Sequence, residues 1–349
     1  MSGIARRLYR GEIDVDFVGR RKLWYGLSAL LLLVSLAGLL LHGLNLGVEF
    51  RGGSVFSFKA PAATEIQDVR TTFGDAGAHQ VIVQTTNNGW RVTTESLSPE
   101  GVTNVQKAVA KKFDLPQNQV TLQVIGASWG GQVADKAITG LIVFMLAIIL
   151  YLTLAFEWKM ALSAVVALLH DLVITAGVYA WSGFEVTPAT LLGFLTILGY
   201  SLYDAVVVFD MIKEVTAKLG TTSKMTYTQA ANNALNHTLI RSLNTTLVAI
   251  LPVAAILFIG TTLFGAGTLK DLSLALFVGM IVGTYSSLCV ATPMLVTLKE
   301  REPRYQAIAR RLSAQSGGGK GGGAKSLRQP VTAGASNGSV SETEKRKKK

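Results

Sequence analysis

The sequence predicts an α-helical polytopic membrane protein: six membrane-spanning helices, with one small α+β domain between the first helix and the second. Three observations support this fold class. The 349 residues are 49% hydrophobic and only 16% charged, which is too apolar for an ordinary soluble protein. Uninterrupted apolar runs of about 20 residues recur, and this length crosses a bilayer. The Lys and Arg residues behind the net charge of +11 flank these runs, which indicates membrane topology rather than nucleic-acid binding.

The candidate spans are the apolar runs 23–41, 137–156, 160–181, 188–212, 240–259 and 272–297. The first run follows three basic residues, but its apolar core is too long for a signal peptide and no small-x-small cleavage site follows it. We therefore expect an uncleaved helix. The basic segments are the N-terminal arm 1–22, the 213–237 connection and the tail 299–349. All three fall on one side of the membrane if the chain crosses six times, so both termini are expected in the cytoplasm.

Residues 51–132 are the one large segment that is not apolar, and we expect them to fold outside the cytoplasm. The segments SVFSFKA and VTLQVIGAS alternate as strands do, and HQVIVQTT and WRVTT flank the turn signal NNG as a hairpin. Two helical segments lie between the strands, the second with Ser98 as its N-cap. The order βαββαβ is typical of a ferredoxin-like sandwich. This segment has no metal-ligand spacing, nucleophile elbow or phosphate-binding loop, so we expect no enzyme activity, metal or cofactor.

Composition predicts the character of the remaining residues. Residues 133–298 carry the second to sixth spans. The tail 299–349 is basic and, from about residue 314, rich in Gly, Ser and Lys, so we expect it to be disordered in the cytoplasm. Weak attraction of this tail to anionic lipid or to the ribosome is the alternative. The single cysteine, Cys289, lies in an apolar run and is expected to be a packing residue.

Ionisable residues inside the spans are the strongest functional signal. Asp204 of the fourth span shares a helix face with Tyr200 and Ser201. The fifth span runs the opposite way and carries Arg241, with Asn244 and Thr245 next on the same face. Both charges are expected in the cytoplasmic half of the bilayer, at depths that allow them to pair.

The third span adds a second carboxylate, Asp171, near mid-membrane, and His170, which points about 100° away from it. A charged carboxylate in lipid costs about 2.5 to 3.5 kcal/mol, so these groups should face the bundle interior, a partner or water. For Asp204 and Arg241, two hypotheses stay open: a static ion pair that sets helix register, or a proton carrier whose affinity changes as Arg241 moves. For His170 we favour a packing role.

Two groups of glycines stand out. Gly47, Gly52 and Gly53 follow the first span and predict either a hinge for the external domain or a tight turn. Gly279 and Gly283 form a GxxxG face in the sixth span that Ser286 and Ser287 continue, which predicts close helix packing.

Five separated motifs, spread over about residues 15–300, resemble the SecF type of the SecD/SecF family of protein-export subunits. They are GLNLGVEFRGGS, ALLHDLVITAGVY, GYSLYDAVVVFDMIKE, ALNHTLIRSLNTTL and LALFVGMIVGTYSSLCVATPML. The resemblance implies an RND-like six-helix half-transporter in the bacterial cell membrane. It implies that the half-transporter pairs with SecD around the SecYEG channel, near SecA and YajC-like subunits. It further implies that the proton gradient is used to draw unfolded preproteins outward, with Asp204 and Arg241 at the family's proton-coupling positions.

Three residues of the fourth-span motif depart from the family: Tyr203 where Asn is usual, Ala205 where Thr or Ser is usual, and Met211 where Arg is usual. These departures change the polar neighbours of Asp204 while the carboxylate itself remains. Two other function classes stay open. One is half of an RND-type exporter of small molecules or lipids, which normally has larger external domains. The other is a purely structural membrane subunit, which needs no protonatable residue.

Overall fold

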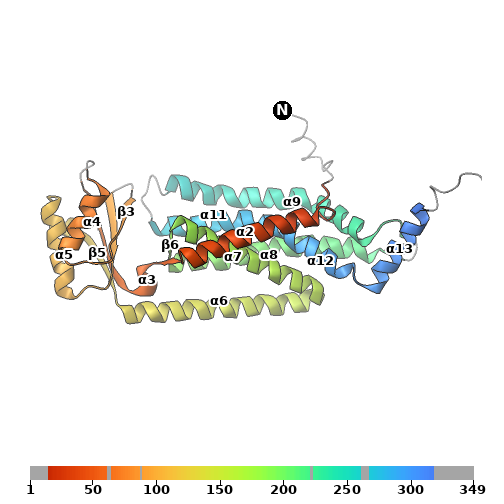
Figure 1. Cartoon of the computed structure of the whole chain (residues 1–349), viewed down its shortest axis with the longest axis horizontal. Helices are drawn as coiled ribbons and strands as arrows, with labels where there is room; N and C mark the ends of the chain where they lie inside the picture. The colour runs from red at the N-terminus through yellow and green to blue at the C-terminus, as the bar shows by residue number, and fades with distance from the viewer. Residues whose placement is uncertain (1–14, 61–63, 87–88, 221–222, 261–266, 318–349) are drawn as a thin grey trace, which may run out of the picture.

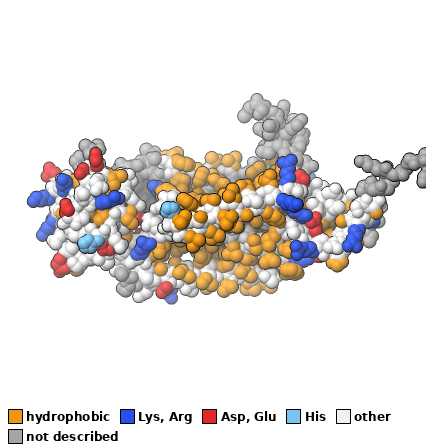
Figure 2. All heavy atoms as spheres, in the orientation of Figure 1, with side chains coloured by type: hydrophobic (Ala, Val, Ile, Leu, Met, Phe, Trp, Pro, Cys, Tyr) orange, Lys and Arg blue, Asp and Glu red, His pale blue; other side chains and the backbone are white. Residues whose placement is uncertain are grey.

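The computed structural model describes residues 15–60, 64–86, 89–220, 223–260 and 267–317. Six helices of this part of the chain are long and apolar enough to cross a membrane, which confirms the predicted number of spans. They lie roughly side by side in an elongated bundle, with the small α+β domain at one end and a short helix at the other (Figure 1). We call these the domain end and the tail end. Apolar side chains cover the middle of the bundle, and Lys and Arg side chains gather beyond them (Figure 2).

The six spans are built from nine helical segments, and two of these segments are π-helical. The segments are α2 (Arg21–Leu41), α6 (Ala127–Ala155), α7 (Trp158–Ser182), α8 (Pro188–Ala217), α9 (Tyr227–Ala255) with a π-helical turn (Ile256–Gly260), and α11 (Gly267–Ser286) continued by a π-helical turn (Ser287–Ala291) and α12 (Thr292–Lys299).

The helices extend beyond the apolar runs that predicted them. Helix α6 begins at Ala127, inside the segment predicted as domain 51–132, and α9 begins at Tyr227 although its apolar run begins at residue 240. Backbone hydrogen bonding continues past the lipid boundary, whereas apolar composition is needed only where lipid surrounds the helix. The predicted spans are therefore shorter than the helices that contain them.

The small domain has the predicted βαββαβ order. Its elements are β2 (Gly53–Phe58), α4 (Ile66–Asp75), β3 (Ile82–Thr86), β4 (Gly89–Thr94), α5 (Pro99–Lys112) and β5 (Thr121–Ile125), with a short 3-10 turn (Gln117–Gln119) before the last strand. The sheet order is β3-β4-β2-β5 with antiparallel pairing throughout, which is the ferredoxin-like arrangement. Ser98 caps α5 as predicted, because its Oγ atom accepts a hydrogen bond from the backbone N–H of Gly101 at 3.1 Å. The buried rings of Phe56 and Phe73 lie 5.3 Å apart in the core.

The connection between the first span and this domain is short and anchored. Strand β1 (Asn45–Leu46) pairs in parallel with β6 (Glu185–Val186), which lies between α7 and α8, and the single helical turn α3 (Val48–Arg51) follows. Gly52 and Gly53 then adopt φ values of 77° and 151°, which favour glycine. The structure thus has the tight turn at these glycines, and their action as a hinge stays a hypothesis.

The predicted GxxxG pair packs inside this chain, against α8. A Cβ on Gly279 would lie 2.6 Å from Ile197 Cγ2, and a Cβ on Gly283 would lie 3.0 Å from the Cβ of Ser201. The two glycines therefore allow α8 and α11 to approach closely. This contact brings the polar face of α8 against the end of α11.

At the tail end, residues predicted to be disordered form a helix. Helix α13 (Pro303–Gly317) buries Tyr305 and Ile308, and the Tyr305 ring lies 4.5 Å from the ring of Tyr227. Arg304 also donates to the carbonyl of Leu219 at 2.7 Å. The prediction of a disordered tail from residue 299 is wrong for residues 303–317, because their apolar side chains find a surface on α9 that the sequence does not reveal. Residues 318–349, and the basic part of the N-terminal arm at 1–14, lie outside the described chain.

Candidate functional site

The first carboxylate of the site, Asp171, is completely buried where α7, α8 and α11 meet. Ser201 of α8 donates to its Oδ2 at 2.6 Å, and Ser286 at the end of α11 donates to the same oxygen at 2.8 Å. The Nδ1 atom of His170 lies 3.1 Å from Oδ1. Neighbouring helix positions are about 100° apart, but these two side chains contact each other, so the prediction that His170 points away from Asp171 is wrong. Both oxygens of this carboxylate have partners.

The second carboxylate, Asp204, is buried between α8, α9 and the π-helical turn. Ser287 donates to its Oδ2, and Ser242 of α9 is buried beside it. One turn earlier on α8, the Tyr200 hydroxyl donates to Thr246 at 3.0 Å. Polar side chains of three spans therefore surround Asp204.

The two carboxylates are joined through adjacent residues. On α8, Ser201 binds Asp171, and Asp204 follows one turn later on the same buried face. On the sixth span, Ser286 binds Asp171 and Ser287 binds Asp204. All five of these residues are at most 6% exposed. The arrangement is one continuous polar site with two acidic centres, in an otherwise apolar bundle.

Arg241 does not reach this site in the structure. Its side chain is exposed on α9, and among the described residues neither Asp204 nor Asp171 has a Lys or Arg within ion-pair distance. Asn244 and Thr245 share this exposed face with Arg241, as the sequence predicts, and they therefore lie away from Asp204. Successive residues of a helix are about 100° apart, and the face of α9 that turns inward carries Ser242 and Thr246 instead.

The sequence does not predict that several of the residues around Asp171 and Asp204 lie beside these carboxylates. Ser286 and Ser287 are a polar pair in a long apolar run, and this pair was the available signal. Ser242 and Thr246 gave no separate signal, because the neighbouring face of α9 is equally polar. Of the departures from the family motif, Ala205 is buried and Tyr203 is exposed. The hydroxyl that reaches Asp204 therefore comes from the sixth span.

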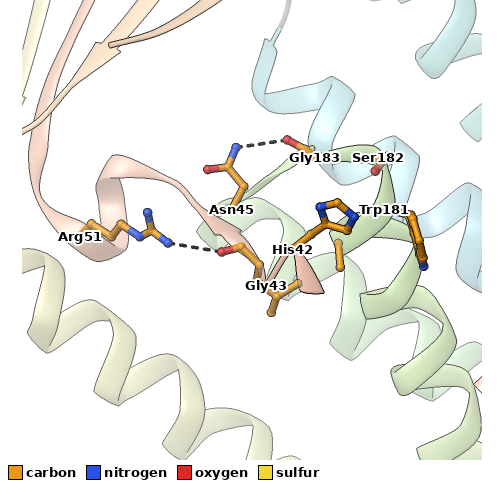
Figure 3. Close-up of a pocket in the computed structure, with 9 residues that line it drawn as sticks. His42, Gly43, Asn45, Arg51, Trp181, Ser182 and Gly183 are labelled. Atoms are coloured by element: carbon orange, nitrogen blue, oxygen red, sulfur yellow. Dashed lines mark hydrogen bonds between the residues drawn. The ribbon is translucent and has the colours of Figure 1, made fainter. Parts of the chain in front are cut away.

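A pocket of about 430 Å³ lies at the domain end, apart from the two carboxylates (Figure 3). His42 and Trp181 lie on its wall with their ring planes tilted relative to each other and their centroids 5.0 Å apart. On the other side, Arg51 donates to the carbonyl of Leu44 at 3.4 Å and Asn45 donates to the carbonyl of Gly183 at 3.1 Å. The Asn45 bond joins the segment after α2 to the end of α7, and the Arg51 bond joins α3 to that same segment, so the pocket borders the anchored connection to the domain.

Two carboxylates outside the spans connect the bundle to its neighbours. At the domain end, Gln84 of β3 donates to Glu185 at 3.2 Å, and burial raises the pKa of Glu185. At the tail end, Glu302 accepts from Lys159 at 2.8 Å. Burial alone would raise the pKa of Glu302, but the hydrogen bond from Lys159 and the charge of Lys299 hold it below its usual value. No group of His, Cys, Asp and Glu in the described chain is arranged to hold a metal ion.

Comparison with known proteins gives consistent matches. Residues 104–301 match the family described as protein export membrane protein SecD/SecF, C-terminal, and residues 37–60 match the SecD/SecF GG motif. The protein translocase subunit SecF of Streptomyces coelicolor is 45% identical over 93% of this chain and 87% of its own length. The SecF subunit of Mycobacterium tuberculosis is 39% identical over 91% of this chain and 75% of its own length.

Solved structures agree with this match. The crystal structure of SecDF from Thermus thermophilus, a translocon-associated membrane protein, superposes with a TM-score of 0.75 and 28% identity over 85% of this chain. A second SecDF structure, in a super-membrane-facing form, gives a TM-score of 0.61 and 27% identity over 86% of this chain. This chain spans 42% and 40% of those two chains, respectively.

Proposed function

Because this chain belongs to the SecD/SecF family of bacterial protein-export membrane proteins, we propose that it is a SecF-type subunit that couples the proton-motive force to protein export. It pairs with SecD, and together they help to draw unfolded preproteins through the SecYEG channel, which works with SecA and YajC-like subunits. Two features support SecD as the partner. The relatives of this chain are SecF subunits, and the similar SecDF chains are more than twice as long.

The observation that carries the proton-coupling proposal is the state of Asp204. It is a carboxylate inside an apolar span, held by a serine and not by a described Lys or Arg. A static ion pair would explain a buried charge without any function. A carboxylate without such a pair is stable in the bilayer when it binds a proton or reaches water, and these are the two states of a proton carrier. Asp171 is a second candidate carrier beside it.

Arg241 takes its role in another step of the cycle. It is exposed on α9, and the next residue of that helix, Ser242, lies beside Asp204. Rotation of α9 or approach of the partner subunit brings its charge toward the carboxylate, which favours the ionised form and promotes proton release. One proton crossing the membrane potential supplies about 2.3 kcal/mol per 100 mV, which can bias a conformational change. This amount of free energy suits the movement of a chain that is already unfolded.

The orientation of the chain is part of the same proposal. The N-terminal arm, the 213–237 connection and the tail are basic, which favours the cytoplasm for both termini and for the tail end of the bundle. The ferredoxin-like domain then faces the other side, where a translocating chain emerges.

The test is Asp204→Asn in membrane vesicles that contain the complete export complex. Asparagine is nearly isosteric but cannot titrate, so export that depends on the proton gradient should be lost while membrane abundance and co-purification with SecD stay normal. Asp210→Asn is the matched control, since Asp210 is exposed on the same helix. Gradient-stimulated export at the control rate in Asp204→Asn would refute proton coupling through this residue. Efflux of small molecules without any effect on export would favour an exporter.

A further inference from the structure

Ser286 and Ser287 each have two acceptors within reach of one hydroxyl group. The Oγ atom of Ser286 lies 2.8 Å from Asp171 Oδ2 and 3.1 Å from the backbone carbonyl oxygen of Gly283. The Oγ atom of Ser287 contacts Asp204 Oδ2 and lies 3.0 Å from the carbonyl oxygen of Thr284. A serine hydroxyl carries a single hydrogen, so it can satisfy only one of its two acceptors at a time.

The protonation state of the carboxylate decides which acceptor receives that hydrogen. An ionised carboxylate accepts only, so the serine donates to it. A protonated carboxyl group can donate its own O–H to the serine oxygen. The serine hydrogen is then free to turn to the backbone carbonyl one turn earlier in the helix.

We propose that Ser286 and Ser287 are hydrogen-bond switches that transmit proton binding at Asp171 and Asp204 to the backbone of the sixth span. This inference rests on the proposed function, in which these carboxylates bind and release protons. Proton uptake adds one proton to a carboxylate oxygen and breaks no covalent bond. The two serines are positioning residues, because they act through the carboxylates and do not carry the proton across the membrane themselves.

The backbone at this point has the geometry of a switch. α11 ends at Ser286 and the π-helical turn begins at Ser287, so the helical hydrogen-bond pattern changes between the two serines. Thr292 donates to the carbonyl of Ser287 at 3.0 Å, which occupies a backbone acceptor of the π-helical turn. Side chains that bond into a helix backbone change its bend, and π-helical turns occur often at functional sites. A hydroxyl that gains or loses a backbone acceptor here therefore favours one geometry of the sixth span over another.

Other polar groups also face the two carboxylates. His170 of α7 and Ser201 of α8 also face Asp171. Tyr200, one turn earlier on α8, and Ser242 of α9 face Asp204. No Lys or Arg of the described chain pairs with either carboxylate. Within the described chain, the sixth span contacts both acidic centres through side chains adjacent in sequence, which suits it to respond to both.

The experiment compares Ser286→Ala and Ser287→Ala with Ser273→Ala in the intact complex with SecD. Ser273 is a matched control, because it is buried on the same helix and donates to the carbonyl of Lys270 at 3.1 Å, and no carboxylate contact is recorded for it. The first measurement is gradient-stimulated export in vesicles. Because a hydrogen bond to a charged group is lost, export in Ser286→Ala and Ser287→Ala is expected to slow about tenfold or more. Export in Ser273→Ala should be unchanged.

The second measurement is the infrared C=O stretching band of the protonated carboxyl groups, assigned with Asp171→Asn and Asp204→Asn. Removing the serine partner should shift the band of Asp171 in Ser286→Ala and that of Asp204 in Ser287→Ala, and Ser273→Ala should shift neither. Unshifted bands, or export at the control rate in both serine variants, would overturn the switch. Normal export in Asp204→Asn would instead overturn the proposed function, whatever the serine variants do.

Discussion

Replacement of Gly279 by alanine tests the helix contact that assembles the site. Gly279 lies on α11 against Ile197 of α8, and an added Cβ would come within 2.6 Å of Ile197 Cγ2. Ile197 is 3% exposed, so its side chain has little room to move away. The two helices must therefore separate, and this separation also acts on Ser201, one turn further along α8.

Two opposing effects set the magnitude. Alanine is a better helix former than glycine by up to about 1 kcal/mol. Overpacking of a well-packed interior costs about 1 to 3 kcal/mol. We expect the packing effect to win, with a net loss of about 1 to 2 kcal/mol in the free energy of unfolding. Gly199→Ala is the matched control, because a Cβ there would meet nothing within 4 Å and only the helix-propensity gain remains.

Thermal unfolding of the purified protein in detergent measures the difference. The Tm of Gly279→Ala should fall and that of Gly199→Ala should hold or rise, so that the two differ by about 1 to 4 °C. Gradient-stimulated export should also fall in Gly279→Ala. Equal Tm values for the two variants would show that α8 and α11 do not pack through Gly279, and would remove the support for the position of Ser201 beside Asp171.

Three further predictions follow from the two ends of the molecule. A single cysteine at the exposed position Asn104 should react with an impermeant maleimide only from outside the cell, and labelling from the cytoplasmic side would contradict the proposed orientation. Gly53→Ala should destabilise the small domain and increase its proteolysis, because φ is 151° there and a Cβ would lie 2.9 Å from Val48 Cγ1; unchanged proteolysis would contradict this. Since the folded-state pKa of Glu302 lies below its usual value, its pairing with Lys159 should stabilise the tail end above the ordinary glutamate pKa of 4.5 and lose that effect as the pH falls through the lowered value. Glu302→Gln should flatten that part of a Tm-against-pH curve, and an unaltered curve would argue against the pair.

The sequence predicted the architecture well because membrane spans and strand order have local signals. Length and apolar composition identify a span, and alternation with turn residues identifies the hairpin of the small domain. Asp171, Asp204 and Ser201 were also assigned correctly to the interior, because polar side chains in an apolar run must avoid lipid. The family resemblance pointed to Asp204 as well.

What the sequence determined by itself was the number of spans, the domain and the buried position of the carboxylates. Only the tertiary structure decided which groups touch them. In lipid, the face of a helix that packs and the face that meets lipid are both apolar, so hydropathy does not tell them apart. Polar residues also occur on more than one face of α9, so only the packed structure shows that Ser242 and Thr246 turn inward while Asn244 and Thr245 are exposed. For the same reason, the two hydroxyls at the end of α11 became visible as partners of Asp171 and Asp204 only once α7, α8, α9 and α11 were packed together.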